Sequence, residues 1–223
     1  MTARLSVTGL WSRRGSQTVI RGLTMSVDAG EFVLITGANG SGKSTLLESV
    51  AGVLRPSAGE VRLDGLRIDG RGADHVARCG LSLIHQQRRL FSSMTVRENV
   101  ELAAFAMGRR AHPEPVAGLL ERFGIARFAN TAAGLLSGGE QRLVALARGL
   151  YSRPRLVLLD EPLAALADDL RDRLLVELTG IAAGGASIVV VEHDSDRVRP
   201  FADRVLALRM GDLVSVARPG APS

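Results

Sequence analysis

Cysteine is almost absent from the sequence. The single cysteine, Cys79, cannot form a disulfide within the chain, and it is expected to be a small buried or half-buried residue. The N-terminus has no basic segment followed by an apolar core, so no secretory signal is expected. Both absences fit a cytosolic protein.

Long hydrophobic runs are also missing. Apolar runs such as Ile188–Val191 and Leu156–Leu159 are short, and none approaches the roughly 20 residues of a membrane-spanning helix. The chain is therefore not expected to cross a bilayer by itself. Hydrophobic residues make up 46% and charged residues 23% of the 223 positions, which suits one compact domain, with or without an inserted subdomain.

Aromatic residues make up only 4% of the chain, although its net charge is +5. A basic chain can bind nucleic acid or an acidic membrane surface. The basic residues here are scattered, without a long basic run and without interleaved aromatics, so nucleic-acid binding is not expected.

Lysine is nearly absent too. Of the 28 basic residues, 27 are arginine and the other is Lys43. A compositional bias explains the arginines but not the exception. Position 43 therefore needs chemistry that a wide, planar guanidinium cannot supply.

Lys43 lies in a glycine-rich segment, Gly-Ala-Asn-Gly-Ser-Gly-Lys-Ser at 37–44, that fits the phosphate-loop pattern G-x-x-x-x-G-K-[ST]. The apolar run Glu31–Thr36 before it suits a buried strand, and apolar residues at helical spacing follow it. The backbone N–H groups of such a loop wrap an anion, Lys43 supplies charge to the β- and γ-phosphates, and Ser44 offers a hydroxyl to Mg²⁺. The alternative, a chance glycine-rich turn, leaves the lone lysine unexplained.

Two acidic residues follow a second apolar run. Leu156–Asp160 is predicted to be a buried strand, which places Asp160 and Glu161 at the edge where ligands bind in open α/β sheets. Asp160 suits coordination of Mg²⁺ through a water molecule, and Glu161 suits polarisation of an attacking water. The alternative is an acidic loop that only solvates the strand end.

A third motif, Leu-Ser-Gly-Gly-Glu-Gln at 136–141, begins a predicted helix, Gly138–Leu150. Ser137 as N-cap and Glu140 three residues later fit a capping box. A serine hydroxyl and bare glycine N–H groups at a helix N-terminus also bind anions. The two interpretations are compatible, and capping alone does not explain the paired glycines.

Helical segments alternate with apolar strands along the rest of the chain, which predicts an α/β fold with a largely parallel core sheet. The middle of the chain is mostly helical and is predicted to be an inserted subdomain. Strands are predicted at 5–10, 24–27, 31–36, 60–63, 156–160, 187–192, 204–209 and 213–216, and helices at 46–54, 95–107, 113–123, 138–150 and 168–182.

The three motifs together resemble the nucleotide-binding subunit of an ABC transporter, over nearly the whole chain. The resemblance implies a P-loop NTPase core with a mostly parallel sheet, an N-terminal antiparallel β region and an inserted helical subdomain. It implies a single domain at 1–217, with its core at about 1–86 and 151–217, the helical subdomain at about 87–150, and a frayed tail at 218–223.

The same resemblance implies ATP and Mg²⁺ as cofactors and a head-to-tail dimer, formed by two copies or with a related ATPase subunit. Each ATP would lie between Gly37–Thr45 of one copy and Ser137–Gly139 of the other. It also implies transmembrane permease subunits as partners and a cytoplasmic location, peripheral on the inner face of the plasma membrane.

Further residue roles follow from the resemblance alone. Gln86 corresponds to the glutamine that senses Mg²⁺ and the γ-phosphate, unless it is only a polar strand end. His193 corresponds to the switch histidine that touches the γ-phosphate, unless it is a histidine satisfied at a strand end. The expected catalytic residues are Glu161, His193 and Lys43, the expected Mg²⁺ ligands are Ser44, Gln86 and Asp160, and the expected nucleotide contacts are Gly37, Ala38, Asn39, Gly40, Ser41, Gly42, Lys43, Ser44, Thr45, Gln86, Ser137, Gly138 and Gly139.

Two positions depart from the family pattern. Arg14 stands where an aromatic residue normally stacks on adenine, so the stacking partner is either its guanidinium plane or Trp11. Ala167 replaces an aspartate that often links the two sites of the dimer. Branched-chain amino-acid importers are similar in tolerating alanine there and in the sequence Val-Glu-His-Asp at 191–194.

The expected function is therefore ATP hydrolysis coupled to transport through a separate permease. Two alternatives stay open: a soluble ABC-type ATPase acting on ribosomes or DNA, and a regulatory module that closes on ATP with little turnover. Cargo and direction cannot be predicted, because the cargo contacts lie on the membrane partner.

Overall fold

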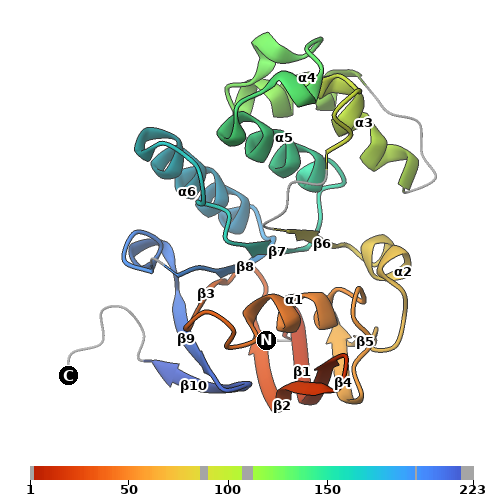
Figure 1. Ribbon diagram of the computed structural model, residues 1–223, viewed down its shortest axis with the longest axis vertical. Coiled ribbons are helices and arrows are strands. Elements are labelled where there is room, and N and C mark those ends of the chain that lie inside the picture. Colours follow the sequence, from red (N-terminus) through yellow and green to blue (C-terminus); the bar gives the residue numbers. More distant parts are fainter. Residues whose placement is uncertain (1–2, 86–89, 107–112, 194, 217–223) are drawn as a thin grey trace.

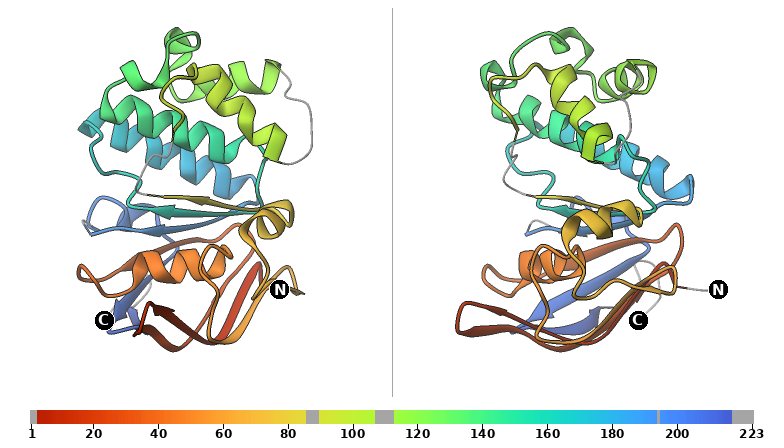
Figure 2. Two further views of the ribbon diagram at one scale, coloured as in Figure 1. Left: turned by 45° about the vertical axis from the view of Figure 1, so that its right-hand side comes forward. Right: turned by 90° about the vertical axis from the view of Figure 1, so that its right-hand side faces the viewer.

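The computed structural model describes residues 3–85, 90–106, 113–193 and 195–216. Figure 1 shows three levels: a helical layer at one end, a central sheet, and a second sheet at the other end with a helix between the two sheets. The two turned views of Figure 2 agree with this layering.

The central sheet has the order β10–β9–β3–β8–β7–β6 in the described residues. All of its neighbours pair in parallel except β10, which is antiparallel to β9. This confirms the predicted mostly parallel sheet. Its strands are β3 (Phe32–Thr36), β6 (Leu81–Ile84), β7 (Leu156–Asp160), β8 (Ser187–Val191), β9 (Arg204–Arg209) and β10 (Asp212–Val216).

The second sheet has the order β2–β1–β4–β5 and is antiparallel, as expected for the N-terminal region. Its strands are β1 (Leu5–Arg14), β2 (Gln17–Val27), β4 (Ala58–Leu63) and β5 (Leu66–Arg67). Asp64 and Gly65 form the turn between β4 and β5, because both residues have positive φ (48° and 78°) between paired Leu63 and Leu66.

Two of the described helices begin with a capping box, and the one before α5 is the box that the sequence predicts. Thr95 and Glu98 exchange hydrogen bonds before α3, since the Glu98 N–H donates to Thr95 Oγ1 (3.2 Å) and the Thr95 N–H donates to Glu98 Oε2 (2.7 Å). Ser137 and Glu140 form the same arrangement before α5. The helices are α1 (Lys43–Val50), α2 (Ala73–Arg78), α3 (Val96–Ala106), α4 (Pro113–Arg122), α5 (Gly138–Leu150) and α6 (Asp168–Ala183), with 3₁₀ turns at Ala126–Phe128, Ala133–Leu135 and Arg199–Phe201.

The central sheet separates two hydrophobic cores, because alternate residues of a strand point to opposite faces. Along β3, Phe32 and Leu34 face a core shared with the helices α3 to α6. Val33 and Ile35 face the other core, which α1 and the antiparallel sheet complete. Both faces of β3 are therefore buried against apolar side chains. This packing fixes the C-terminal end of the strand, from which the glycine-rich loop begins.

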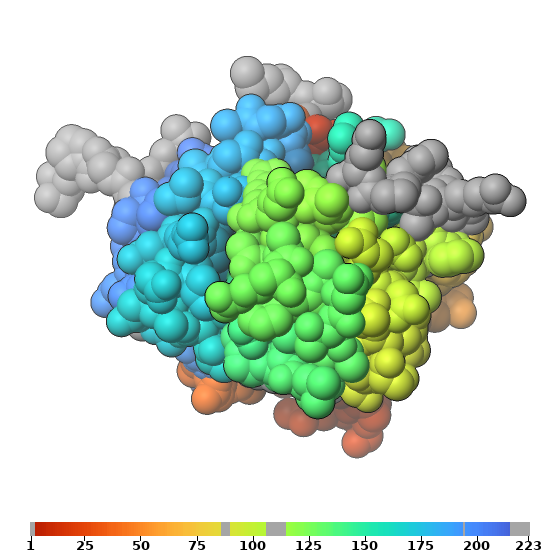
Figure 3. All heavy atoms as spheres, turned by 90° about the horizontal axis from the view of Figure 1, so that it is seen from above, coloured from red at the N-terminus to blue at the C-terminus, as the bar shows by residue number. Residues whose placement is uncertain are grey.

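Helices α3, α4 and α5 form the helical layer, and Figure 3 looks down on it, with α6 beside it. This layer shares one core with the sheet, since Val100 and Val116 belong to the same cluster as Val157 and Val190. The subdomain limits of 87–150 stay a prediction, and the tail at 218–223 lies outside the described residues. No helix in the described ranges has the length and apolar character needed to cross a membrane.

Candidate functional site

The glycine-rich loop joins the end of β3 to the start of α1, as predicted. Gly40 and Gly42 have φ of 76° and 106°, which residues with a Cβ rarely adopt. A Cβ on Gly37 would lie 2.5 Å from the carbonyl oxygen of Leu208, so this position has no room for a side chain. The loop therefore needs its glycines both for backbone freedom and for close packing.

Lys43 points back into the loop from the first turn of α1. The residue is only 6% exposed, and its ammonium group donates hydrogen bonds to the carbonyl oxygens of Gly37 (2.7 Å) and Ala38 (3.1 Å). Burial lowers the pKa of Lys43, and the nearby carboxylates of Glu161 and Asp160 oppose that shift. The only lysine thus places a buried positive charge at the centre of the loop.

Ser44 and Asp160 meet beside the lysine. The Ser44 hydroxyl donates a hydrogen bond to Asp160 Oδ1 (3.1 Å), although the two residues lie 116 positions apart. Burial raises the pKa of Asp160, and the hydrogen bond from Ser44 opposes that shift. Two side-chain oxygens of the kind that bind metal ions therefore lie close together where the end of β7 faces the start of α1.

Glu161 and His193 form a second pair at the same edge of the sheet. His193 Nε2 lies 3.0 Å from Glu161 Oε1. The backbone N–H of Glu161 donates to the carbonyl oxygen of Val191 (2.9 Å), which extends the contact between β7 and β8 past the last strand residues. The structure thus brings together two of the three residues that were expected to be catalytic, Glu161 and His193.

A cavity of about 730 Å³ opens over these groups. The glycine-rich loop lines it, and so does Arg14, whose Nε donates to Thr45 Oγ1 (3.1 Å) and whose guanidinium pairs with Glu48. Trp11 instead packs against Gly22 on β2, 3.4 Å from the place of a Cβ there, and it is not among the lining residues. The lining residues are Arg14, Gln17, Thr18, Val19, Arg21, Asn39, Gly40, Ser41, Gly42, Lys43, Ser44, Thr45, Glu161, His193 and Met210.

The cavity fits a phosphate group and a hard cation. Ser41 Oγ is buried and has no hydrogen-bond partner among the described residues, as expected for a hydroxyl that faces a ligand. The described residues contain no cluster of three or more His, Cys, Asp or Glu side chains that could hold a metal ion. The adjacent oxygens of Ser44 and Asp160 are of the type that Mg²⁺ takes, because this ion is commonly held by one or two protein oxygens together with phosphate and water.

Ser137–Gly139 lies elsewhere in the chain, at the N-terminus of α5, and does not line the cavity. The Glu140 N–H donates to Ser137 Oγ (3.3 Å), so the predicted capping box is confirmed. Gly139 lies against the loop after β7, since a Cβ on it would be 3.3 Å from the Ala165 carbonyl oxygen. Gln86 lies outside the described residues.

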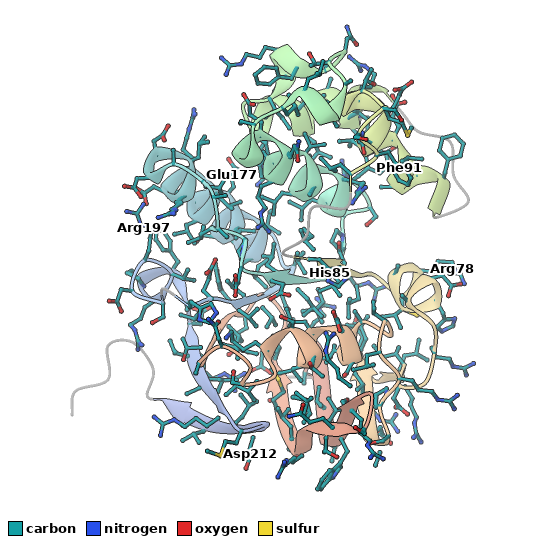
Figure 4. All side chains as sticks on the ribbon, in the orientation of Figure 1. Arg78, His85, Phe91, Glu177, Arg197 and Asp212 are labelled. Atoms are coloured by element: carbon teal, nitrogen blue, oxygen red, sulfur yellow. The ribbon has the colours of Figure 1, made fainter. Side chains whose placement is uncertain are left out.

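Sequence reasoning missed a buried polar group behind the site. Glu192 Oε1 accepts a hydrogen bond from the Leu163 N–H (2.9 Å), and Arg142 Nη1 donates to the carbonyl oxygen of His85 (3.4 Å). Figure 4 shows His85 at the level of the central sheet, where it follows β6, and its Nδ1 lies 4.0 Å from Glu48 Oε1 on α1. The available signal is an acidic residue directly after the apolar run Ile188–Val191.

Known proteins share this sequence pattern. Residues 20–164 match the family model described as ABC transporter. The chain is 37% identical to the Fe(3+) ions import ATP-binding protein FbpC 1 of Rhodococcus jostii (98% of this chain, 63% of that protein) and 35% identical to the energy-coupling factor transporter ATP-binding protein EcfA of Methanothermobacter thermautotrophicus (90% and 66%). It is 32% identical to the branched-chain amino acid transport ATP-binding protein BraF of Pseudomonas aeruginosa (93% and 88%).

The relatives differ in cargo and in length. Branched-chain amino acids are one cargo beside iron, sulfate and spermidine in their names, so no single branch is favoured. All of these names describe transport proteins, which does not favour the alternatives of a ribosome- or DNA-directed ATPase or a regulatory module. The chain spans 62 to 66% of the first three relatives.

Solved structures confirm the fold. A nucleotide-free ATP-binding cassette from an ABC transporter superposes with a TM-score of 0.88 at 26% identity, covering 97% of this chain and 91% of that one. A dimeric ATP-binding cassette in a post-hydrolysis state, bound to ADP and Pi, gives 0.88 at 28% identity, covering 96% and 98%.

Proposed function

Because the chain belongs to the ABC transporter family, we propose that it binds ATP with Mg²⁺ and hydrolyses it to drive transport through a separate membrane permease. One observation carries the proposal: a single cavity contains a buried lysine, a serine beside an aspartate, and a glutamate beside a histidine. These are the groups that phosphoryl transfer to water requires.

The glycine-rich loop binds the phosphates in this proposal. Its backbone N–H groups and the N-terminus of α1 face the anion, and the Lys43 ammonium exchanges its two carbonyl contacts for phosphate oxygens. Bound Mg²⁺, held by Ser44 and Asp160, supplies neutralisation of the phosphate charge. Arg14 lines the same cavity and offers its guanidinium plane for stacking on the adenine base.

Glu161 activates the water in this proposal. Its carboxylate orients the water and accepts a proton as the water oxygen attacks the γ-phosphorus and the bond to the departing ADP oxygen breaks. His193, 3.0 Å from Glu161, fixes the direction of that carboxylate and faces the same cavity. Gln86 is proposed as a further Mg²⁺ contact from the sequence alone.

A second copy completes the site. Ser137–Gly139 stands outside the cavity of its own chain, yet its hydroxyl and glycines form an anion-binding helix N-terminus. A head-to-tail dimer places this segment over the nucleotide of the partner copy, and a related ATPase subunit can take the place of the second copy. The cassette solved with ADP and Pi is dimeric, which supports this arrangement.

A groove between α2, β6 and the helical layer is the proposed permease contact. Its volume is about 250 Å³, and Val53, Ala103 and Arg148 are among the residues that line it. Phe91 is 56% exposed, and Figure 4 shows it in the helical layer. Val53, which lines the groove, is 47% exposed. An exposed apolar side chain in a groove suits a helix of a membrane partner, so we place the chain at the inner face of the plasma membrane.

The test is ATP turnover by the purified chain. Phosphate release should require Mg²⁺, and Lys43→Ala should abolish it while the variant keeps a parental melting temperature. The tagged parent should also co-purify with a polytopic membrane protein. A folded parent without Mg²⁺-dependent phosphate release would contradict the proposal.

A further inference from the structure

Glu192 is a buried carboxyl group that the proposed reaction does not use. It follows β8 directly and is only 6% exposed. Its Oε1 accepts a hydrogen bond from the N–H of Leu163, 29 positions earlier in the chain (2.9 Å). The side chain therefore ties the end of β8 to residues 161–167, the loop that connects β7 with α6.

This contact lies where the β7–β8 ladder ends. The last paired residues are Asp160 and Val191, and the Glu161 N–H still reaches the Val191 carbonyl oxygen. Beyond that point the loop turns away, and the Glu192 side chain provides the acceptor for the Leu163 N–H. A side chain thus continues the connection after the backbone ladder stops.

The backbone of the loop is strained, so something must hold it. Glu161 and Ala165 have φ of 47° and 61°, in the left-handed region that is unfavourable for residues with a Cβ. Such conformations persist only where surrounding contacts fix them. The hydrogen bond from Leu163 to Glu192 lies between the two strained residues and is buried.

The position of the loop matters on both of its sides. At its start, the Glu161 carboxylate faces His193 in the cavity. Further along, the Ala165 carbonyl oxygen packs against Gly139 at the N-terminus of α5. A shift of the loop would therefore move Glu161, the proposed general base. It would also disturb the contact of the loop with Ser137–Gly139, the segment proposed to cover the partner's nucleotide.

Charged groups surround Glu192 on several elements. The pKa of Glu192 is raised to about 7, chiefly by burial and also by Glu161, although the N–H groups of Leu163 and His193 and the charge of Arg142 on α5 act to lower it. The charge of Glu192 in turn acts to raise the pKa of Lys43 on α1. An oxygen of the side chain accepts from Leu163 whether the carboxyl is protonated or ionised.

We propose that Glu192 is a positioning residue: its buried side-chain oxygen holds the loop 161–167 and thereby aims the Glu161 carboxylate at the attacking water. The proposal rests on the ATP hydrolysis proposed above. It predicts that an oxygen acceptor at position 192 is needed for turnover but not for nucleotide binding.

Two substitutions test this in the full chain. Glu192→Met fills the space without an acceptor, whereas Glu192→Gln keeps an oxygen that can accept from Leu163. Asp203→Ala is the matched control, because Asp203 also accepts a strand N–H, from Phe32 (2.9 Å), but away from the cavity. The measurements are kcat and KM for MgATP, and the melting temperature.

Glu192→Met should lower kcat by about tenfold or more and leave KM nearly unchanged, since a small misplacement of a catalytic group is costly. Glu192→Gln should keep most of the parental kcat. Asp203→Ala should keep the parental kcat even if its melting temperature falls. Parental kcat in Glu192→Met, or equal loss in Glu192→Met and Glu192→Gln, would overturn the positioning role.

The failure of this inference differs from failure of the proposed function. A parent that hydrolyses ATP, together with an unaffected Glu192→Met, removes the role of Glu192 alone. A parent without turnover removes both proposals. If Glu192→Met does not fold, kcat and KM of Glu192→Ala are measured instead, because alanine also lacks the acceptor. An unstable Glu192→Gln would overturn the proposal, because the acceptor oxygen that it retains should preserve the loop.

Discussion

Glu192 gives the protein a pH-dependent stability that one substitution should remove. Its pKa is about 7 in the folded chain, against an ordinary value of 4.5, chiefly because burial disfavours the ionised form. Between pH 4.5 and 7, the folded carboxyl keeps a proton that the unfolded carboxyl has lost. The free energy of unfolding therefore falls as the pH rises through this window.

The size of the effect follows from proton linkage. One proton held by the folded state alone changes the free energy of unfolding by about 1.4 kcal/mol per pH unit. Over the window from pH 4.5 to 7, this amounts to about 3 kcal/mol. The contribution is fully present below pH 4.5 and is lost above pH 7.

Glu192→Gln keeps the shape and an acceptor oxygen but does not titrate. Urea denaturation of parent and variant at pH 5, 6, 7 and 8 measures the difference in their free energies of unfolding. Titrations of all other groups, including Asp160, largely cancel in this difference. The variant should gain about 3 kcal/mol relative to the parent between pH 5 and 8; a difference that is independent of pH would refute the reasoning.

Three further substitutions test single residues of the site. Lys43→Arg should lower MgATP turnover at least about tenfold, because a planar guanidinium does not fit where the ammonium contacts the loop carbonyls; parental turnover would contradict the argument from the lone lysine. Ser137→Ala should lower the free energy of unfolding, measured by urea denaturation, by about 1 kcal/mol through loss of the cap. It should also prevent ATP-driven dimerisation in size-exclusion chromatography; dimerisation like that of the parent would mean that Ser137 serves only as a helix cap. Arg14→Tyr should tighten ATP binding by about 1 kcal/mol through stacking, seen as a lower KM with parental kcat, and an unchanged KM would mean that position 14 does not reach the base.

The sequence was most informative where chemistry requires fixed residue types at fixed spacing. The glycine-rich loop and the acidic end of β7 were predicted from separate segments, and the hydrogen bond between Ser44 and Asp160 shows that the fold brings them together. The capping boxes were equally predictable, because Ser137 and Glu140 interact within one helical turn.

Contacts between segments that lie far apart in the sequence were harder to predict. Strands β1 and β2 are longer than predicted, because their length depends on pairing with each other and with β4 rather than on local alternation. Helix α2 and strand β6 were not predicted, because six and four residues are too few for a periodic pattern to stand out. The choice between Arg14 and Trp11 also needed the structure, which places Arg14 at the cavity.

Glu192 shows the same limit within the site. Its sequence neighbours indicate only the end of a strand, whereas its partner Leu163 lies 29 positions away and donates a backbone group that no residue type reveals. The proposed composite dimer site is harder still to predict, because Ser137–Gly139 does not line the cavity with the glycine-rich loop of its own chain. Such contacts follow from topology and assembly rather than from local pattern.

The measurement that tests the central claim most directly is ATP turnover by Glu161→Gln. The amide keeps the shape of Glu161 beside His193 but cannot accept the proton of the attacking water. The account predicts parental ATP affinity, accumulation of an ATP-bound dimer, and phosphate release lowered by roughly 10²- to 10⁴-fold. Phosphate release at the parental rate would contradict it.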